Sequence, residues 1–180
     1  MPRPRGNPFE ICPFKVVVDS NESAPYPFNQ IKAKNKKPLL VTCNRMPLWN
    51  HERRDVEVKG ETHSVGFADY SIAGMESRIA IERKSIDDLF GTLASRRVRF
   101  EAEIKRLHED CESASVIVEG DWSAIMLWKG HGPSPASVFG TIMHWIDRYP
   151  NVHWHLCPSR AFAEKVCFRT LEIFWNRNHA

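Results

Sequence analysis

The segment RIAIERKSIDD, residues 78–88, begins as an apolar strand and ends in charges of both signs. Successive side chains of a strand point to opposite faces, so Ile79 and Ile81 share one face. Glu82 and Lys84 share the other face and sit side by side. Apolar residues then recur at helical spacing. The segment therefore predicts a buried strand that leads directly into a helix and carries a carboxylate and an ammonium at its end.

Strand and helix patterns alternate along the rest of the chain. Residues 63–72 and 77–85 predict a hairpin that reverses through AGMES. The other apolar or alternating runs predict strands at 15–19, 39–43, 55–58, 114–121 and 151–157. Helical spacing is found at 86–93 and 104–111, with a break between them, and again at 134–149 and 159–177. This order predicts an α/β fold in which helices flank a mixed central β-sheet.

The length of 180 residues is enough for one domain with its own core. Residues 1–13 are rich in proline and arginine, and we expect them to form a flexible basic arm. Residues 14–180 are expected to form a single domain. The net charge of +3 permits nucleic-acid binding without requiring it, so local clusters of charge must decide the partner.

Cysteine usage and hydropathy predict an intracellular protein. The five cysteines form no C-x-x-C pair, and an odd number fits poorly with a disulfide framework. No apolar run is long enough for a signal peptide or a membrane span. We therefore expect free thiols, no membrane partner and, for a bacterial or viral chain, a place in the cytoplasm or nucleoid.

Carboxylates near the charged strand end predict a metal site. Magnesium needs several oxygen ligands, so Glu82 requires at least one further acid. Asp69, at the exit of the preceding strand, is the obvious second ligand. Asp19, which ends the first strand, is a candidate third ligand, and Glu22 follows it closely. Lys84 beside such a cation could steer a water and neutralise charge on a phosphate.

The same residues carry a resemblance to a known family. Residues 65–107 resemble the nuclease core of the XPF-type structure-specific endonucleases, whose signature is Gly-Asp, then Glu-Arg-Lys, three residues and Asp. The segment VVVDSNESAPYPF is similar to the family's Asp-x-Arg-Glu segment. The likeness is greatest to short stand-alone bacterial or viral forms. It implies a restriction-endonuclease-like core and a magnesium- or manganese-dependent endonuclease.

The resemblance also implies a role for each matching residue. Asp69 and Glu82 would be metal ligands, with Asp19 and Glu22 as accessory acids. The backbone carbonyl of Arg83 would be a further ligand. Lys84 would be the catalytic lysine and Asp88 the closing signature acid.

Two features separate this chain from the family pattern. Asn21 stands where arginine is frequent, and Ala68 precedes Asp69 where glycine is usual. Neither removes a ligand. No tandem helix-hairpin-helix region and no helicase motifs are found, so the substrate is less well specified than the chemistry. The resemblance implies branched, flap or junction DNA in repair or recombination, and a homodimer or heterodimer formed through the nuclease domain.

Several charged residues also have simpler explanations. A Glu-Lys pair at a strand end is often a surface ion pair. Ser85 and Asp88 fit a helix capping box, so Asp88 could act as a cap rather than in catalysis. DNA contacts are predicted for two basic groups, which could equally be solvated faces: Arg96 and Arg97, and Lys34, Lys36 and Lys37. Arg97 resembles an arginine that the family places beside its site, and Trp49 is a candidate for base stacking.

Three functions remain open from the sequence. The first is the metal-dependent endonuclease. The second is a non-catalytic DNA-binding or scaffold subunit of a nuclease complex. Inactive members lose the acids or the lysine, whereas this chain keeps Asp69, Glu82, Arg83 and Lys84. The third is a junction resolvase or restriction-type nuclease on the same fold.

Overall fold

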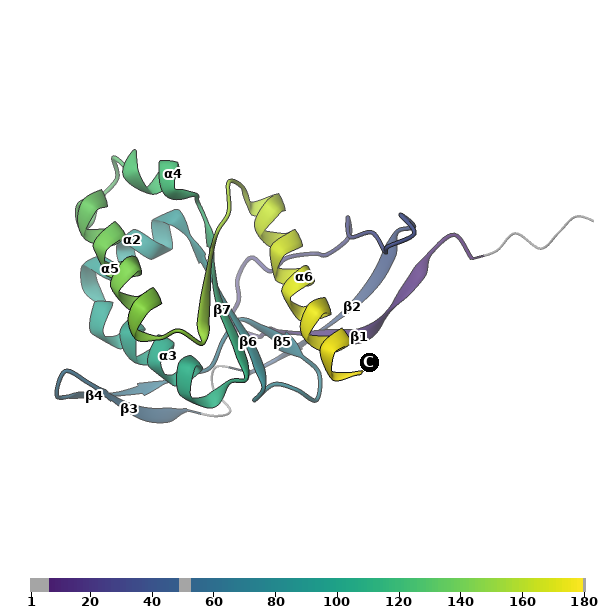
Figure 1. Cartoon of the computed structure of the whole chain (residues 1–180), viewed down its shortest axis with the longest axis horizontal. Helices are drawn as coiled ribbons and strands as arrows, with labels where there is room; N and C mark the ends of the chain where they lie inside the picture. Colours follow the sequence, from purple (N-terminus) through teal and green to yellow (C-terminus); the bar gives the residue numbers. More distant parts are fainter. Residues whose placement is uncertain (1–6, 49–52, 180) are drawn as a thin grey trace, which may run out of the picture.

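A six-stranded sheet organises the computed structural model, which describes residues 7–48 and 53–179 (Figure 1). The strands lie in the order β2-β1-β5-β6-β7-β8. Their bounds are β1 Glu10–Asp19, β2 Leu39–Met46, β5 Tyr70–Ile72, β6 Ile79–Ser85, β7 Ser113–Glu119 and β8 Val152–Leu156. β5 is antiparallel to both of its neighbours, and the other pairs are parallel. The mixed sheet confirms the predicted fold class.

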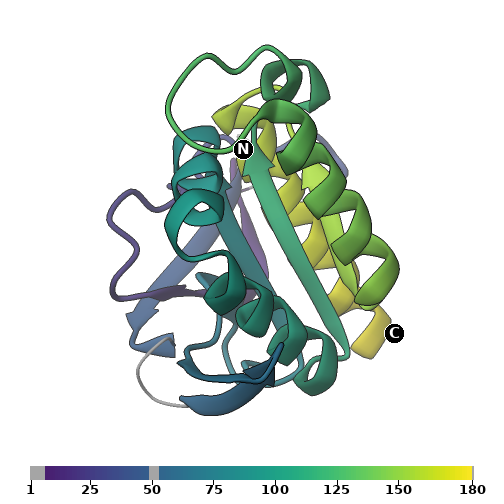
Figure 2. The same ribbon diagram turned by 90° about the vertical axis from the view of Figure 1, so that its left-hand side faces the viewer.

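Helices cover both faces of this sheet. They are α2 Ile86–Ser95, α3 Arg97–Asp110, α4 Trp122–Met126, α5 Pro135–Arg148 and α6 Arg160–Asn178. Figure 2 shows α2, α3 and α5 in front of the sheet and α6 behind it. Ile79 and Ile81 pack in the core under α6, whereas Ala80 packs in the core under α2, α3 and α5. The strand alternation predicted for residues 78–88 is thus confirmed.

The predicted hairpin of residues 63–72 and 77–85 is only partly correct. Tyr70–Ile72 pairs with β6, but residues 61–65 belong to a different sheet. There, β3 (Arg54–Val58) and β4 (Glu61–Val65) form a separate antiparallel pair. This pair packs its valines against Ala102 of α3, so its apolar residues have a small core of their own.

The first strand begins at Glu10, which corrects the expected boundary of the arm at residue 13. Cys12 and Phe14 are buried in the core under α6. Pro13 has no N–H to donate, and the register with β2 shifts in this region, between Ile11 and Lys15. The arm therefore ends earlier than expected, and residues 1–6 lie outside the described part of the chain.

Serine caps begin the three helices whose starts bear on the site and its surroundings. Ser85 caps α2, Ser134 caps α5 ahead of Pro135, and Ser159 caps α6. The predicted break between two helical segments lies at Arg96, where α2 gives way to α3. Within residues 7–48 and 53–179, no helix combines the length and apolar character needed to cross a membrane.

Candidate active site

A pocket of about 500 Å³ lies on the sheet face covered by α2 and α3. Four residues predicted from the sequence line it: Asp19, Asp69, Glu82 and Lys84. The remaining lining residues come from the loop after β1 and from the two helices: Asn21, Thr92, Arg96, Arg99, Phe100 and Glu103. The fold thus brings residues from three strand ends to one place.

Glu82 and Lys84 form a close ion pair inside this pocket. The Lys84 Nζ lies 2.6 Å from Glu82 Oε1 and 4.8 Å from the ring centroid of Phe100. Burial lowers the pKa of Lys84, but the charges of Glu82 and Asp69 outweigh it and raise the pKa above its ordinary value. Lys84 therefore carries a positive charge at the floor of the pocket.

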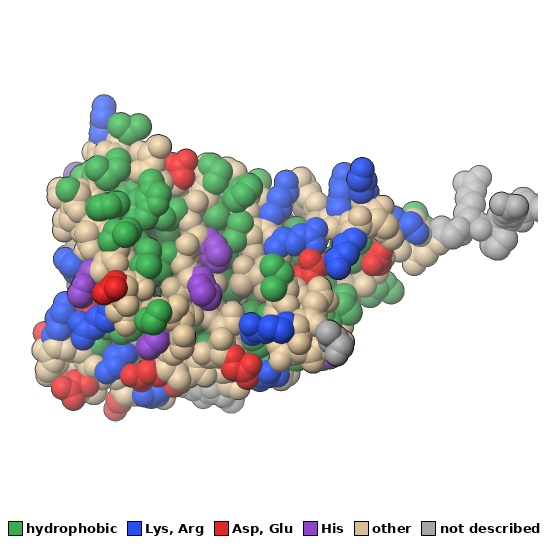
Figure 3. All heavy atoms as spheres, in the orientation of Figure 1, with side chains coloured by type: hydrophobic (Ala, Val, Ile, Leu, Met, Phe, Trp, Pro, Cys, Tyr) green, Lys and Arg blue, Asp and Glu red, His purple; other side chains and the backbone are tan. Residues whose placement is uncertain are grey.

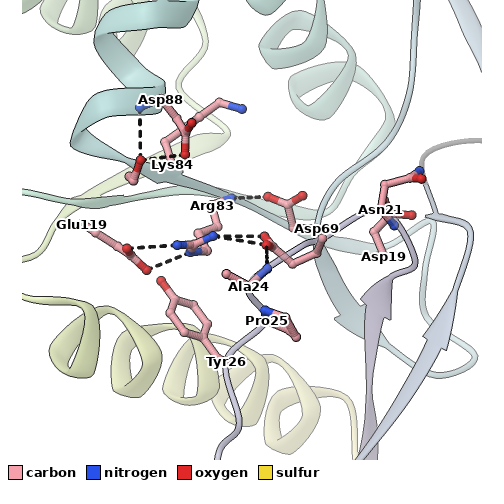
Figure 4. A network of polar contacts seen from close by, with 12 residues as sticks. Asp19, Asn21, Ala24, Pro25, Tyr26, Asp69, Arg83, Lys84, Asp88 and Glu119 are labelled. Atoms are coloured by element: carbon pink, nitrogen blue, oxygen red, sulfur yellow. Dashed lines mark hydrogen bonds and ion pairs between the residues drawn. The ribbon is translucent and has the colours of Figure 1, made fainter.

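Asp69 is held by the backbones of two strands. Its N–H donates to the carbonyl of Ile81 at 3.0 Å, and its carbonyl accepts from the N–H of Asp19 at 2.8 Å. Its Oδ2 accepts from the N–H of Arg83 at 2.7 Å (Figure 4). Burial raises the pKa of Asp69 well above its usual range, and the charge of Glu82 raises it further. A cation beside this carboxylate would offset that cost.

Asp19, the last residue of β1, and Asn21, in the loop that follows, both line the pocket. Asp19 is buried, and the N–H of Asn21 donates to Asp19 Oδ2 at 3.1 Å. Arg45 of β2 fixes this loop by donating to the carbonyls of Ser20 and Glu22 at 3.0 and 2.7 Å. The position of Asp19 therefore depends on its bond to Asn21 and on the contacts between Arg45 and the loop.

The structure does not bring Glu22 into the pocket. Its carboxylate accepts from the N–H of Ala24 at 2.8 Å and from Arg83 Nη1 at 3.2 Å. Arg83 points to the face opposite Glu82 and Lys84, as the strand period requires. Glu22 thus fixes the loop that carries Asp19, rather than joining Asp19 in the pocket.

Glu119 joins two arginines on this opposite face, in a cluster that we call the arginine clamp (Glu22, Arg83, Glu119 and Arg160). It accepts from Arg83 Nε and Nη2 at 2.7 and 3.0 Å, and from Arg160 Nη1 at 2.9 Å. Arg160 also donates to the carbonyl of Ala24 at 2.6 Å. The clamp therefore ties the loop after β1 to β6, β7 and α6.

The acids of the pocket suit a hard divalent cation. Asp69 and Glu82 offer only oxygen donors, which magnesium and manganese prefer. The raised pKa of Asp69 shows that its charged form lacks sufficient compensation in the protein alone. Over residues 7–48 and 53–179, no three His, Cys, Asp or Glu side chains are already grouped as metal ligands. Lys84 donates to Glu82 Oε1, so a cation would share that oxygen with Lys84 or bind Oε2.

Glu103 is a pocket residue that the sequence analysis missed. It lies on α3, one turn beyond Arg99, whose Nε is 3.7 Å from Glu103 Oε1. Burial raises the pKa of Glu103 to about 7, and the charge of Glu82 contributes to the shift. The i,i+4 spacing of Arg99 and Glu103 was the available signal. That spacing predicts a pair on one helix face, but it does not reveal that this face of α3 points toward Asp69 and Glu82.

The raised pKa of Glu103 predicts how the stability of the folded protein depends on pH. The folded-state pKa of Glu103, about 7, lies above its ordinary value of 4.5, so the folded protein binds more protons between these values. Metal-free protein should therefore lose stability as pH rises through this window, and Glu103→Gln should lose less. Urea unfolding at several pH values, with a chelator present, measures both slopes. Equal slopes for the two proteins would contradict this account.

Asp88 takes part in the start of α2 and does not line the pocket. Its N–H donates to Ser85 Oγ at 3.1 Å, and Ser85 Oγ donates to Asp88 Oδ2 at 2.6 Å. These bonds form the capping arrangement that the sequence offered as the alternative to catalysis. The geometry favours the cap.

Replacing Asp88 with alanine should lower stability by about 0.5–1 kcal/mol, because the capping residue Ser85 loses the carboxylate that its hydroxyl donates to, and the first turn of α2 loses a favourable charge. If the chain is the endonuclease that its sequence resembles, cleavage should slow far less than after substitution of Lys84. Urea unfolding and single-turnover cleavage measure the two effects. If Asp88→Ala and Lys84→Met slow cleavage equally, Asp88 does more than cap the helix.

The predicted basic residues fall in two separate places. Arg96 lines the pocket beside Arg99, whereas Arg97 is not a lining residue. The three predicted lysines lie in the loop before β2, far from the pocket: Lys34, Lys36 and Lys37. Their contacts with DNA stay predictions. Trp49 lies outside the described residues.

Comparisons with known proteins bear on the fold and the family. Residues 31–167 match the ERCC4 domain. The structure of XPF from Aeropyrum pernix has a TM-score of 0.57 and 18% sequence identity, over 88% of this chain and 60% of that one. XPF from Aeropyrum pernix in complex with DNA has a TM-score of 0.52 and 17% identity, over 91% and 66%. This chain thus spans less than two thirds of either relative. No curated protein matches significantly.

Proposed function

The chain belongs to the ERCC4 domain family, and we propose that it is a metal-dependent endonuclease that hydrolyses phosphodiester bonds in DNA. The observation that carries this proposal is the convergence of Asp69, Glu82 and Lys84 in one pocket. A solved structure of the same fold is a complex with DNA, which supports DNA as the partner. The alternative of a surface ion pair does not fit the burial of Glu82.

The pocket residues divide the chemistry among them. Asp69 and Glu82 would hold magnesium or manganese, with Asp19 and the Arg83 carbonyl as further oxygen donors. When bound, the metal supplies Lewis acidity toward the phosphate and lowers the pKa of water. Lys84 places a fixed positive charge where negative charge develops on the phosphate, and it can orient the attacking water. Arg96 and Arg99 add positive charge among the residues that line the pocket.

The substrate that we propose is branched, flapped or junction DNA, with a role in repair or recombination. A panel of labelled four-way junction, flap and plain duplex tests it. Each DNA is incubated with magnesium, with manganese or with a chelator. We expect metal-dependent cutting of the flap, alone or together with the junction, and weaker cutting of the duplex. Preferential cutting of plain duplex would instead favour the restriction-type alternative, and cutting of the four-way junction alone would favour the resolvase.

The non-catalytic alternative gives a different result in the same experiment. A scaffold subunit would bind these DNAs but cut none of them under any metal condition. No observation in the described residues favours it, because Asp69, Glu82 and Lys84 are all retained around one pocket.

We also propose that the domain pairs with a second copy through α4 and α5. Figure 3 shows hydrophobic side chains gathered over these helices. Met126 and Leu127 are 50% and 73% exposed, and Phe139 and Met143, one helical turn apart, are each 44% exposed. Such apolar patches are typical of interaction sites.

Phe139→Glu should weaken this pairing, because it places a charge in the apolar patch. Sedimentation velocity over a range of concentrations measures the effect, with Ile173→Glu, an exposed apolar residue on α6, as the control. A wild-type protein that sediments as a monomer throughout would contradict self-association.

A further inference from the structure

A second charged surface lies where the loop before β2 meets α6. A groove of about 570 Å³ opens there, which we call the basic groove. It is lined by Asn29, Gln30, Ile31, Lys32, Pro38, Lys165 and Arg169. Figure 3 shows lysine and arginine side chains clustered on this side of the molecule. The groove is separate from the acidic pocket and shares no lining residue with it.

The loop before β2, which lines the basic groove, is held in place by buried side chains and by backbone hydrogen bonds. Ile31 and Ala33 are buried in the core under α6. The N–H of Leu39 donates to the carbonyl of Ile31, and the N–H of Ala33 donates to the carbonyl of Lys37, each at 2.9 Å. This anchoring leaves the four lysine side chains of the loop at the surface: Lys32, Lys34, Lys36 and Lys37.

Helix α6 adds two basic side chains to the same surface. Arg169 Nη2 donates to the carbonyl of Lys32 at 2.7 Å, which joins the helix to the loop. Lys165 lies one turn earlier on α6 and is exposed.

Few acids compensate this charge. Glu164 accepts from the backbone N–H of Phe28, Glu172 pairs with Arg169, and Glu10 accepts from Asn35 Nδ2 at 2.8 Å. Within the described part of the chain, no ion pair involves Lys165 or any of the four loop lysines. The surface therefore offers several uncompensated positive charges on a fixed scaffold, which suits a line of phosphates.

The position of the groove excludes one straight duplex from filling both sites. Glu10 pairs with Leu39 at the groove end of β1, while Asp19 stands at the other end. The ten residues of β1 span roughly 30 Å at about 3.3 Å per residue. The groove also lies on the α6 face of the sheet, opposite α2 and α3. DNA that reaches both sites must therefore bend or branch.

We propose that the basic groove binds the phosphate backbone of a second DNA arm while the strand to be cut lies in the acidic pocket. The role during cleavage rests on the proposed nuclease function, but the binding does not. A branched DNA satisfies both surfaces because its arms leave the branch point in different directions. The basic side chains of this surface would then select the DNA substrate and take no part in the cleavage chemistry: Lys32, Lys34, Lys36, Lys37, Lys165 and Arg169.

The test compares DNA binding by two double variants without metal, so that cleavage plays no part. Lys32→Ala/Lys165→Ala removes two charges from the lining of the groove. Lys129→Ala/Arg177→Ala removes two exposed charges elsewhere. Fluorescence anisotropy measures the affinity of each protein for a labelled three-way junction and for a linear duplex with the sequence of one arm. The measurements are repeated over a salt series.

The groove variant should bind the junction about tenfold more weakly, and its slope of log K against log salt should be shallower by about 1.8, for two lost phosphate contacts. Its affinity for the linear duplex, and both affinities of the control variant, should stay within about twofold of wild type. Equal losses for junction and duplex, equal losses in the control variant, or no loss at all would overturn the proposal. A wild-type protein that binds as expected but never cuts would overturn only the nuclease function.

Discussion

Replacing Lys84 with methionine is expected to slow metal-dependent cleavage about 10²- to 10³-fold, the loss typical of removing one electrostatic group from a preorganised site. Metal binding should not weaken. Lys84 donates to Glu82 Oε1 in the protein alone, so it competes with a cation for that oxygen. Methionine keeps the length and apolar stem that pack near Phe100 while removing the charge. Single-turnover cleavage gives the rate, and isothermal titration calorimetry gives the affinity for magnesium.

Glu82→Gln is the matched comparison, because it also removes one charge from the same ion pair. It should lose both cleavage and metal affinity, since an amide oxygen is a weaker ligand than a carboxylate. A loss of cleavage without a loss of metal affinity in Lys84→Met would identify Lys84 as a group that acts on water or phosphate. If Lys84→Met cleaves at the wild-type rate, or loses metal affinity as Glu82→Gln does, that role is wrong.

Replacing Glu119 with alanine is expected to destabilise the protein by about 1–3 kcal/mol, because hydrogen bonds to two charged groups are lost and the largely buried Arg83 loses one of its two acidic partners. Among the described residues, Arg83 would keep Glu22 as its charged partner, and Arg160 would keep two backbone carbonyls and the ring of Tyr26. Urea unfolding measures the change. Cleavage should also slow, because the arginine clamp fixes the loop that directly follows the pocket residue Asp19.

An exposed pair provides the control for this substitution. Arg78 donates to both oxygens of Glu112 at 2.5 and 2.9 Å, but on the surface. Glu112→Ala should therefore barely change the unfolding midpoint. Equal midpoint shifts for Glu112→Ala and Glu119→Ala would show that the buried clamp contributes no more than a surface pair.

The clamp also predicts how stability responds to acid. Burial raises the pKa of Glu119, but the hydrogen bonds and charge of Arg83 outweigh it and hold the pKa below the ordinary 4.5. The contribution of Glu119 is therefore complete above that value and is lost as pH falls through the lower folded-state pKa. Stability measured below pH 4.5 should fall more steeply for wild type than for Glu119→Ala.

The sequence predicted those features of the site that depend on local geometry. The strand period alone placed Glu82 and Lys84 on one face of β6 and Arg83 on the other. The fold class followed from the alternation of strands and helices, and the serine before α2 marked where the strand ends. These features depend on neighbours only a few residues away, so the pattern of the chain is enough to predict them.

Features set by distant partners could not be predicted in this way. Glu22 looked like an accessory acid because it follows Asp19, but Arg83, 61 residues away, draws it to the opposite face. Glu103 lines the pocket with Glu82 because α3 packs beside the end of β6. The basic groove joins Lys32 to Arg169, which lie 137 residues apart. Each position depends on how the sheet brings remote segments together.

The most direct test is single-turnover cleavage of a labelled flap or junction by wild type and Asp69→Asn, with magnesium and with a chelator. Asp69 is the pocket acid held by both β1 and β6, and its substitution removes one charge without changing its shape. The structure predicts that wild type cuts only with the metal, and that Asp69→Asn binds the DNA normally but does not cut it. Cleavage by wild type in the chelator, or equal rates for the two proteins with magnesium, would contradict the proposed active site.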